Sequence, residues 1–404
     1  MSGVSRVRAL WPALVAAGAA EGGRRLLAPR APALEPVRID PATYFSAEEI
    51  ARGRRYARPQ LALAMARSAI DLGALALLAR RPPAGLRRTW SSPAVGGAVT
   101  AAGLSLTLSL PSLPLRALAR RRAIAVGLDT QSWGAWAGDL AKASAISTVI
   151  VSGAGAGVVT GTRRYPRGWW APVAAGSVVF GGVLAALAPI VLDPIFNDFE
   201  PLPDGETRSD VLALARDAGV TVGEVYSVDA SRRTTAANAY VTGLGPTKRV
   251  VLYDTLLDRY GRDEIRLVVA HELGHVHHRD VPRSIIYAAM VAPAAALAVQ
   301  RLSWELSPQR GTPGTLPALA LAAALVTAPI GLIGNHLSRA IERRADHFSL
   351  KLAGAPDAFV SFERTIALQN VADLDPPRWV TRLLASHPPT AERIGAAVAF
   401  AQAA

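Results

Sequence analysis

Residues 271–278 read His-Glu-Leu-Gly-His-Val-His-His and hold four of the seven histidines in the chain. On a helix, His271 and His275 lie four residues apart on one face, a spacing at which both imidazoles can bind the same zinc ion. The carboxylate of Glu272 lies beside them and can take a proton from a zinc-bound water molecule, whose pKa the metal lowers to about 7. The stretch therefore predicts a catalytic site with one Zn2+ per chain, in which His271 and His275 are ligands and Glu272 is the general base.

The flanking residues favour a helix around this motif. Asp263 and Glu264 are typical of a first helical turn, and Pro282 lies beyond the expected end. Apolar positions lie between these limits, at Ile265, Val268, Val269 and Leu273. We therefore expect the polar zinc ligands to lie on a buried helix.

A catalytic zinc needs a third protein ligand and one open position. We predict Glu342 as that ligand, in the charged stretch 339–346 near the C-terminus. Asp346 lies one turn further on the same face and could accept a hydrogen bond from the other ring nitrogen of a ligand histidine. His336 and His347 are alternative third ligands, and a solvated charged helix face is the alternative explanation of the stretch.

The composition points to a membrane protein. Hydrophobic residues make up 50% of the 404 residues and the mean hydropathy is +0.24, values typical of apolar blocks that a bilayer hides. The net charge of +13 favours anionic partners such as membrane lipids. We expect no nucleic-acid partner, because the charge is nearly all arginine and partly reflects an Arg- and Ala-rich coding bias. The absence of cysteine excludes disulfides, thiolate ligands and cysteine nucleophiles.

Six apolar stretches have about the length that crosses a hydrocarbon core as a helix. They are residues 61–79, 94–115, 140–160, 170–191, 285–300 and 315–335. A shorter stretch, 9–20, is either the apolar region of a signal peptide or a tilted first span, and we favour the span. The prediction is a mainly α, polytopic bundle of about seven spans.

A long polar segment, 193–283, interrupts the apolar stretches. We expect a helix at 207–218, a strand at 224–228, and a hairpin of strands 238–241 and 249–253 around a glycine- and proline-rich turn. We therefore predict four regions. Residues 1–192 form the N-terminal spans, and residues 193–283 form the protease core with a small β-sheet. Residues 284–335 form a two-span hairpin, and residues 336–404 form a C-terminal soluble helical segment that contains the third ligand.

Arginine placement predicts the orientation. Eight arginines lie between residues 24 and 58, and four lie between residues 80 and 88. The richer loop should be cytoplasmic, so the polar segment and the C-terminal tail of this multi-pass protein should face the cytoplasm. Within one span, Arg67 and Asp71 share a helix face, where we expect them to pair, either in a wet interior or as a staple between helices.

Several segments, in the same order along the chain, resemble the CAAX prenyl protease family of integral-membrane zinc metallopeptidases, of the a-factor-converting type. They are Tyr44-Phe45-Ser46-Ala47-Glu48-Glu49, Pro194-Ile195-Phe196-Asn197, Asn238-Ala239-Tyr240, Lys248-Arg249-Val250-Val251-Leu252-Tyr253-Asp254-Thr255-Leu256-Leu257 and Ser386-His387-Pro388-Pro389. The resemblance covers most of the chain. It implies seven spans around an intramembrane chamber and a gluzincin-like zinc protease domain.

The resemblance also implies roles for individual residues. It places zinc ligands at His271, His275 and Glu342, the base at Glu272, and a supporting aspartate at Asp346. It further implies that Asn238 holds substrate backbone beside an edge strand, and that His387 and Arg393 line the catalytic cleft. By their residue types alone, His387 could polarise a substrate carbonyl, or both it and Arg393 could be capping or salt-bridge residues.

The sequence leaves more than one substrate and more than one activity open. The family usually has Trp after the second zinc histidine, whereas this chain has Val276 followed by His277 and His278, as in heat-shock-type membrane zinc proteases. We expect a monomer that cuts peptide or protein substrates, either lipidated C-terminal tails or misfolded membrane proteins. A membrane scaffold or transporter with structural zinc, or a lipid-gathering protein with incidental histidines, are the alternatives outside this class.

Overall fold

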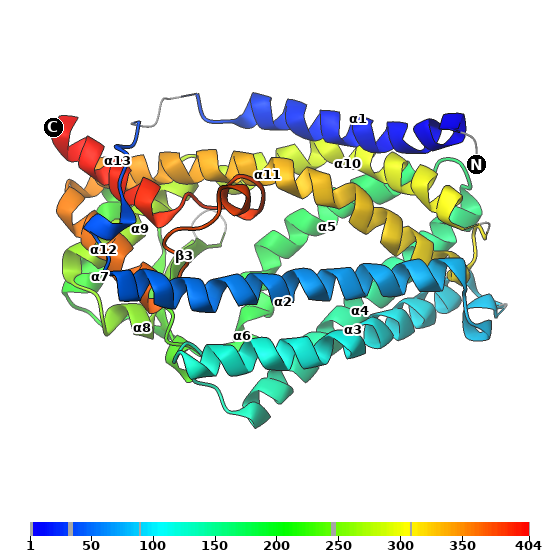
Figure 1. Cartoon of the computed structure of the whole chain (residues 1–404), viewed down its shortest axis with the longest axis horizontal. Coiled ribbons are helices and arrows are strands. Elements are labelled where there is room, and N and C mark those ends of the chain that lie inside the picture. The colour runs from blue at the N-terminus through cyan, green and yellow to red at the C-terminus, as the bar shows by residue number, and fades with distance from the viewer. Residues whose placement is uncertain (1–2, 31–34, 89, 244–247, 308, 404) are drawn as a thin grey trace.

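The computed structural model describes residues 3–30, 35–88, 90–243, 248–307 and 309–403. Long helices run along the long axis of the molecule, and short helices with a small sheet gather at one end (Figure 1). The long helices are α1 Gly3–Leu27, α2 Ala47–Arg80, α3 Pro93–Ala125, α4 Trp133–Arg164, α5 Trp170–Val191, α10 Asp280–Leu306 and α11 Leu316–Ala353.

Six of the long helices are long and apolar enough to cross a membrane, within the described residues. They contain the six predicted apolar stretches, so the polytopic helical fold is confirmed. The seventh long helix, α1, lies along α10 and α11.

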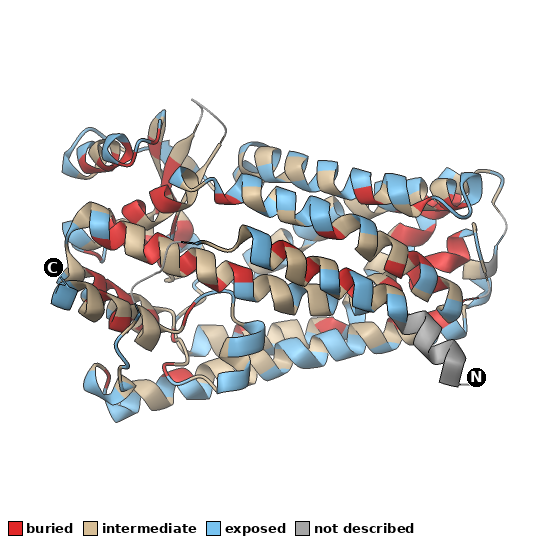
Figure 2. Ribbon diagram, turned by 90° about the horizontal axis from the view of Figure 1, so that it is seen from above, coloured by how far each residue is buried: buried red, intermediate tan, exposed pale blue. Residues whose placement is uncertain are grey.

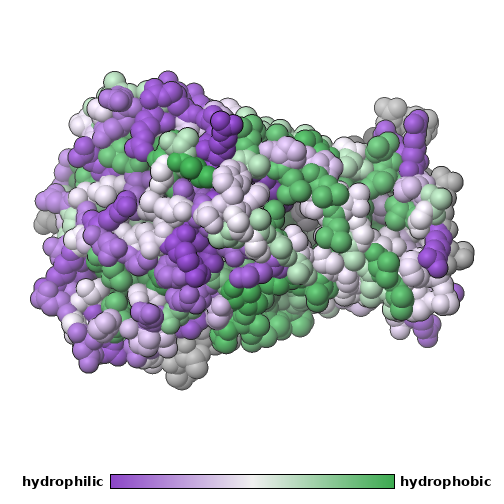
Figure 3. All heavy atoms as spheres, turned by 90° about the horizontal axis from the view of Figure 1, so that it is seen from below, coloured by the Kyte–Doolittle hydropathy of each residue, from purple (hydrophilic) through white to green (hydrophobic). Residues whose placement is uncertain are grey.

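The outer surface of the bundle is apolar, as a lipid-facing surface must be. Val149, Val179 and Leu110 are among the large apolar side chains that remain exposed on these helices. Figure 3 shows an apolar band across the middle of the molecule and hydrophilic side chains at both ends. Figure 2 shows that exposed and half-buried residues make up most of the long helices. Exposed apolar surface on this scale marks contact with a membrane.

The helices extend beyond the apolar stretches, and side-chain caps fix where several of them begin. Helix α2 begins at a capping box, in which the Ser46 hydroxyl accepts from Glu49 N–H and the Glu49 carboxylate accepts from Ser46 N–H. Ser92 and Ser132 cap α3 and α4 in the same position. The starts of α2 and α4 and the end of α3 therefore lie at the compact end of the molecule, whereas the capped start of α3 lies at the opposite end.

The compact end contains the sheet and the shorter helices. Its elements are α6 Asp193–Phe196, β1 Phe199–Pro201, α7 Glu206–Asp217, β2 Glu224–Val228, β3 Ala239–Thr242, β4 Arg249–Tyr253, α8 Asp254–Leu257, α9 Arg262–His277, α12 Pro356–Gln369 and α13 Thr390–Ala403. Short 3-10 turns lie at 41–43, 84–87, 230–232 and 313–315, and a π-helical turn lies at 380–384. The predicted helix, strand and hairpin of the polar segment are all present.

The sheet has the strand order β1-β2-β4-β3. Strand β4 runs parallel to β2 and antiparallel to β3, with Val225, Val250 and Leu252 fully buried. Apolar side chains of α7 and α9, including Leu214 and Val269, pack into the same core. Strand β3 is left at the edge of the sheet, next to α9.

Two features differ from the sequence-based expectations. Helix α11 passes without interruption through residue 336, where we expected a soluble segment to begin, so Glu342 lies on the extension of the last span. Arg67 and Asp71 do not form the expected ion pair: among the described residues, a buried atom of each side chain lacks a hydrogen-bond partner. A shared helix face brings two side chains near each other, but it does not set their rotamers.

The chain between α1 and α2 crosses over α13. Val37 N–H donates to the Gly395 carbonyl at 3.1 Å, and a Cβ at Gly395 would lie 2.1 Å from the Val37 carbonyl oxygen. Phe45 and Ile394 lie in one buried apolar cluster. This crossing holds α13 against the end of the membrane bundle.

Candidate metal centre

Helix α9 presents His271 and His275 on one face, as their spacing predicts. Its first turn is fixed by Gly261 N–H, which donates to the Glu264 carboxylate at 2.8 Å. At its other end, Arg279 has a φ of 56°, in the left-handed region, and the chain turns there into α10. This turn places the next residue, Asp280, against His275.

Helix α11 crosses α9 closely enough to bring Glu342 to these histidines. The crossing occurs at Gly274, where a Cβ would lie 3.1 Å from the Phe348 ring and 3.5 Å from the Ala345 Cα. A side chain at 274 would therefore press on the Phe348 ring, which packs on α9 at this point. Gly274 lies between the two histidines, so the close approach falls at the metal-binding face.

The three side chains fit a tetrahedral metal ion. The Nε2 atoms of His271 and His275 are 3.2 Å apart, and the Glu342 carboxylate oxygens lie 3.3 Å and 3.7 Å from them. Ligand atoms about 2.1 Å from a tetrahedral zinc are roughly 3.4 Å apart. The buried Glu342 Oε2 has no hydrogen-bond donor among the described residues. These three residues form a group that could hold a metal ion.

Each histidine has a carboxylate against its other ring nitrogen. The Nδ1 of His271 lies 2.9 Å from Asp346 Oδ1, and the Nδ1 of His275 lies 3.0 Å from Asp280 Oδ2. Such contacts leave Nε2 free for a metal and fix the ring orientation. Sequence reasoning did not identify Asp280, because its approach depends on the left-handed Arg279.

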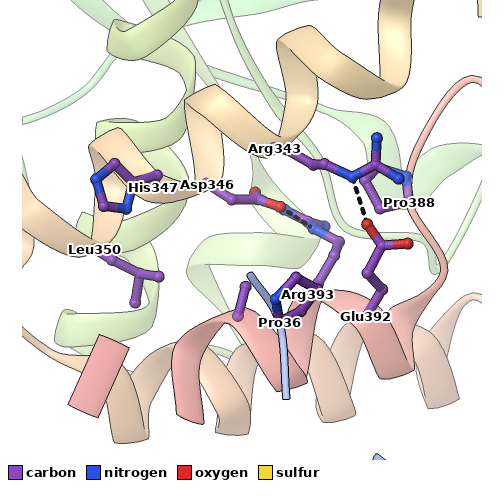
Figure 4. Close-up of a pocket in the computed structure, with 9 residues that line it drawn as sticks. Pro36, Arg343, Asp346, His347, Leu350, Pro388, Glu392 and Arg393 are labelled. Carbon is purple, nitrogen blue, oxygen red and sulfur yellow. Dashed lines mark hydrogen bonds and ion pairs between the residues drawn. The ribbon is translucent and has the colours of Figure 1, made fainter. Parts of the chain in front are cut away.

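Arg393 connects Asp346 to a further buried carboxylate. Its guanidinium donates to both oxygens of Asp346, at 2.9 Å and 2.6 Å, and lies 2.5 Å from Glu363. Figure 4 shows the Arg393 side chain directed at Asp346, beside the Arg343–Glu392 pair. Burial raises the pKa of Glu363 to about 7. Glu363 lies on α12 outside every motif, so no sequence signal identified it.

The metal-binding face opens into a cleft of about 540 Å³. Asn238, Glu272, His387 and Arg393 line this cleft together with His271. Burial raises the pKa of Glu272. The Nε2 of His387 is 3.5 Å from a Glu342 oxygen. The structure thus brings the predicted residues Asn238, His387 and Arg393 to one cleft.

The other histidines near the motif pack elsewhere. His277 Nδ1 is 2.8 Å from the Ala218 carbonyl oxygen, which ties α9 to the end of α7. The ring of His278 packs against Phe348, and that of His347 packs against Phe400. His347 and His336 lie outside the group of possible ligands found among the described residues.

Comparison with known proteins gives two family matches. The model of peptidase family M48 matches residues 201–401. A second model, described as the CAAX prenyl protease N-terminal region with five membrane helices, matches residues 38–198. The two matches lie side by side and together span most of the chain.

Individual relatives agree with these matches. The uncharacterized metalloprotease YhfN of Bacillus subtilis is 30% identical over 300 residues, which are 72% of this chain and 70% of that protein. A CAAX prenyl protease 1 homolog of Arabidopsis thaliana is 33% identical over 225 residues, 53% of this chain and 52% of that protein. The crystal structure of S. mikatae Ste24p has a similar fold, with a TM-score of 0.77 at 19% identity over 96% of this chain and 97% of that one.

Proposed function

Because the chain belongs to peptidase family M48 and is an integral-membrane metalloprotease, we propose that it hydrolyses peptide bonds with a zinc ion held by His271, His275 and Glu342. The observation that carries this proposal is the meeting of three ligand atoms from two helices at tetrahedral spacing. A zinc ion held there would acidify water and polarise a peptide carbonyl.

Glu272 is the proposed general base. As the water oxygen bonds to the carbonyl carbon, Glu272 accepts the proton that the water loses. As the C–N bond breaks, Glu272 returns this proton to the leaving amine. The burial that raises the pKa of Glu272 suits the first step, because a carboxylate with a raised pKa is a stronger base.

The surrounding residues have proposed positioning or binding roles. His387, beside Glu342 and exposed to the cleft, would donate to the substrate carbonyl. Asn238, at the start of the edge strand, would hold substrate backbone. Asp346 and Asp280 would orient the two ligand histidines, with Arg393 holding Asp346.

The proposed substrates are C-terminal tails of lipidated proteins. Relatives named as CAAX prenyl proteases support this class. The position of Glu342 on the extension of a span also supports it, because the site then lies near the membrane surface. The second candidate is misfolded membrane protein, which the His277-His278 sequence favours by its similarity to heat-shock-type proteases.

Substrate profiling with metal removal tests the proposal. We expect the purified protein in liposomes to cleave a fluorogenic peptide that ends in S-farnesylcysteine and three further residues. Treatment with 1,10-phenanthroline should abolish cleavage, and stoichiometric zinc should restore it. Faster cleavage of unfolded membrane segments would instead favour quality control, and cleavage that survives chelation would contradict a zinc mechanism.

We propose that the metal centre faces the cytoplasm, because the arginine-rich connection between α1 and α2 lies at that end. The chain has no cysteine, so single-cysteine variants report topology directly. In intact cells, a membrane-impermeant maleimide should label Ser91→Cys, at the opposite end, and not Gln402→Cys. The reverse pattern would overturn the orientation.

We also propose a monomer, because one chain supplies all three ligand side chains. Light scattering during size-exclusion chromatography in detergent checks the mass.

A further inference from the structure

The cleft runs beside an edge strand that can receive an extended peptide. Among the described residues, β3 pairs with β4 alone. Tyr253 N–H donates to the Asn238 carbonyl at 3.1 Å. This bond shows which residues of the antiparallel pair direct their backbone groups toward β4 and which direct them away. Ala239 and Val241 therefore turn their backbone N–H and C=O groups away from β4. An extended peptide can hydrogen bond to such an edge.

Other parts of the chain cover this edge of the sheet just before β3 begins. Thr235 N–H donates to the Leu128 carbonyl at 3.0 Å, and the Thr235 carbonyl accepts from the Gln369 side chain. Thr130 N–H donates to the Arg233 carbonyl at 3.1 Å. The connection between α3 and α4 thus already occupies the place where a longer peptide would continue, so a peptide on β3 must end or turn near Thr235.

A second cavity, of about 550 Å³, lies at this closed end. Thr235 and Gln369 line it, whereas their chain neighbours Ala236 and Asn370 line the catalytic cleft, so the two cavities adjoin. Its other lining residues include three exposed arginines, namely Arg52 of α2, Arg259 of the turn between α8 and α9, and Arg364 of α12. We call these three side chains the arginine triad.

The arginine triad is largely uncompensated. Arg364 lies 4.0 Å from a Glu49 oxygen, a distant contact, and Arg52 donates to the Val126 carbonyl at 3.3 Å. In the described part of the chain, neither Arg52 nor Arg259 forms an ion pair with a carboxylate. Three positive charges with so little compensation attract an anion and repel a cation.

The charge selects one direction for the peptide. A peptide antiparallel to β3 directs its carboxyl end toward Thr235, and a parallel peptide directs its amino end there. A terminal carboxylate would form charge-assisted hydrogen bonds with guanidinium groups, whereas a terminal ammonium group would be repelled. We propose that the arginine triad binds the free C-terminal carboxylate of the substrate. This inference rests on the proposed peptidase function.

Amidation of the substrate tests the inference without altering the protein. We compare the farnesylated peptide with a free C-terminal carboxylate and the same peptide with a C-terminal amide. The wild-type protein should cleave the free acid with kcat/KM about tenfold or more above that of the amide. In the triple variant Arg52→Gln, Arg259→Gln, Arg364→Gln, this preference should fall to near one. The matched control replaces Arg88, Arg163 and Arg310, which line a cavity at the opposite end, and should retain the preference.

Each outcome decides the inference. Equal cleavage of acid and amide by the wild-type protein would overturn it while the peptidase function stands. A preference that survives in a triple variant still cleaving the amide would also overturn it. If the triple variant does not fold, the three single variants should each reduce the preference, and an undiminished preference in all three counts against the triad. Failure of the wild-type protein to cleave either peptide would overturn the proposed function as well.

Discussion

Replacing Glu272 by Gln should lower kcat for peptide hydrolysis by about 10²- to 10⁴-fold, the usual contribution of a general base. Glutamine has nearly the same shape as glutamate but cannot accept a proton from water at neutral pH. Glu272 lies in the cleft beside His271 but outside the group of possible ligands, so zinc content should remain stoichiometric. Metal analysis and steady-state kinetics on the same preparation separate the two properties.

The control for Glu272→Gln is Glu305→Gln. Glu305 is exposed near the end of α10, far along the bundle from the cleft, and its replacement should leave both zinc content and kcat unchanged. Undiminished hydrolysis by Glu272→Gln would show that another group is the base. Loss of zinc from this variant would place Glu272 among the ligands instead.

Replacing the third ligand should have a larger effect on zinc than replacing an outer carboxylate. Glu342→Ala removes one of three ligand side chains, so the purified protein should lose stoichiometric zinc and measurable hydrolysis. Asp280→Asn keeps all three ligands and removes a negative charge from behind His275. Its zinc affinity should fall by about 10- to 100-fold, and added zinc should restore activity.

Titration with a competing chelator measures both variants, and Glu305→Ala is the control for glutamate loss. Full zinc content in Glu342→Ala would exclude Glu342 as a ligand. Unchanged affinity in Asp280→Asn would show that the contact with His275 Nδ1 has no influence on the metal. Circular dichroism should show that the helices remain formed in every variant, because the core between α9 and the sheet is not altered.

The membrane spans were predictable because their signal is local. Each apolar stretch of about 20 residues can be read from consecutive residues, and its length follows from the bilayer. The ends of the helices were not predictable from hydropathy, because serine caps such as Ser46 and Ser132 start α2 and α4 well before their apolar residues. The same local reading placed the hairpin of β3 and β4.

The pairing of Arg67 with Asp71 shows where local reading fails. Their spacing predicts a shared helix face, and helix α2 provides it. Whether the charged groups meet depends on rotamers and on the side chains of neighbouring helices, which spacing does not specify. The carboxylates Asp280 and Glu363 were missed for a related reason. Asp280 contacts His275 and Glu363 contacts Arg393, but neither carboxylate lies on the helix face that carries the zinc motif.

The sequence by itself determined the polytopic helical fold and the ligand chemistry of His271 and His275. Each span, and the pair of histidines, can be recognised from residues that lie within a few turns of a single helix. Only the tertiary structure decided that Glu342 meets them, that Asp280 and Glu363 complete the surroundings, and that the β3 edge closes at Thr235. These facts depend on helix crossings between segments far apart in the chain, and a crossing is set by packing, as at Gly274 against Ala345 and Phe348. The periodic pattern of apolar residues along one helix does not specify how closely two distant helices approach each other.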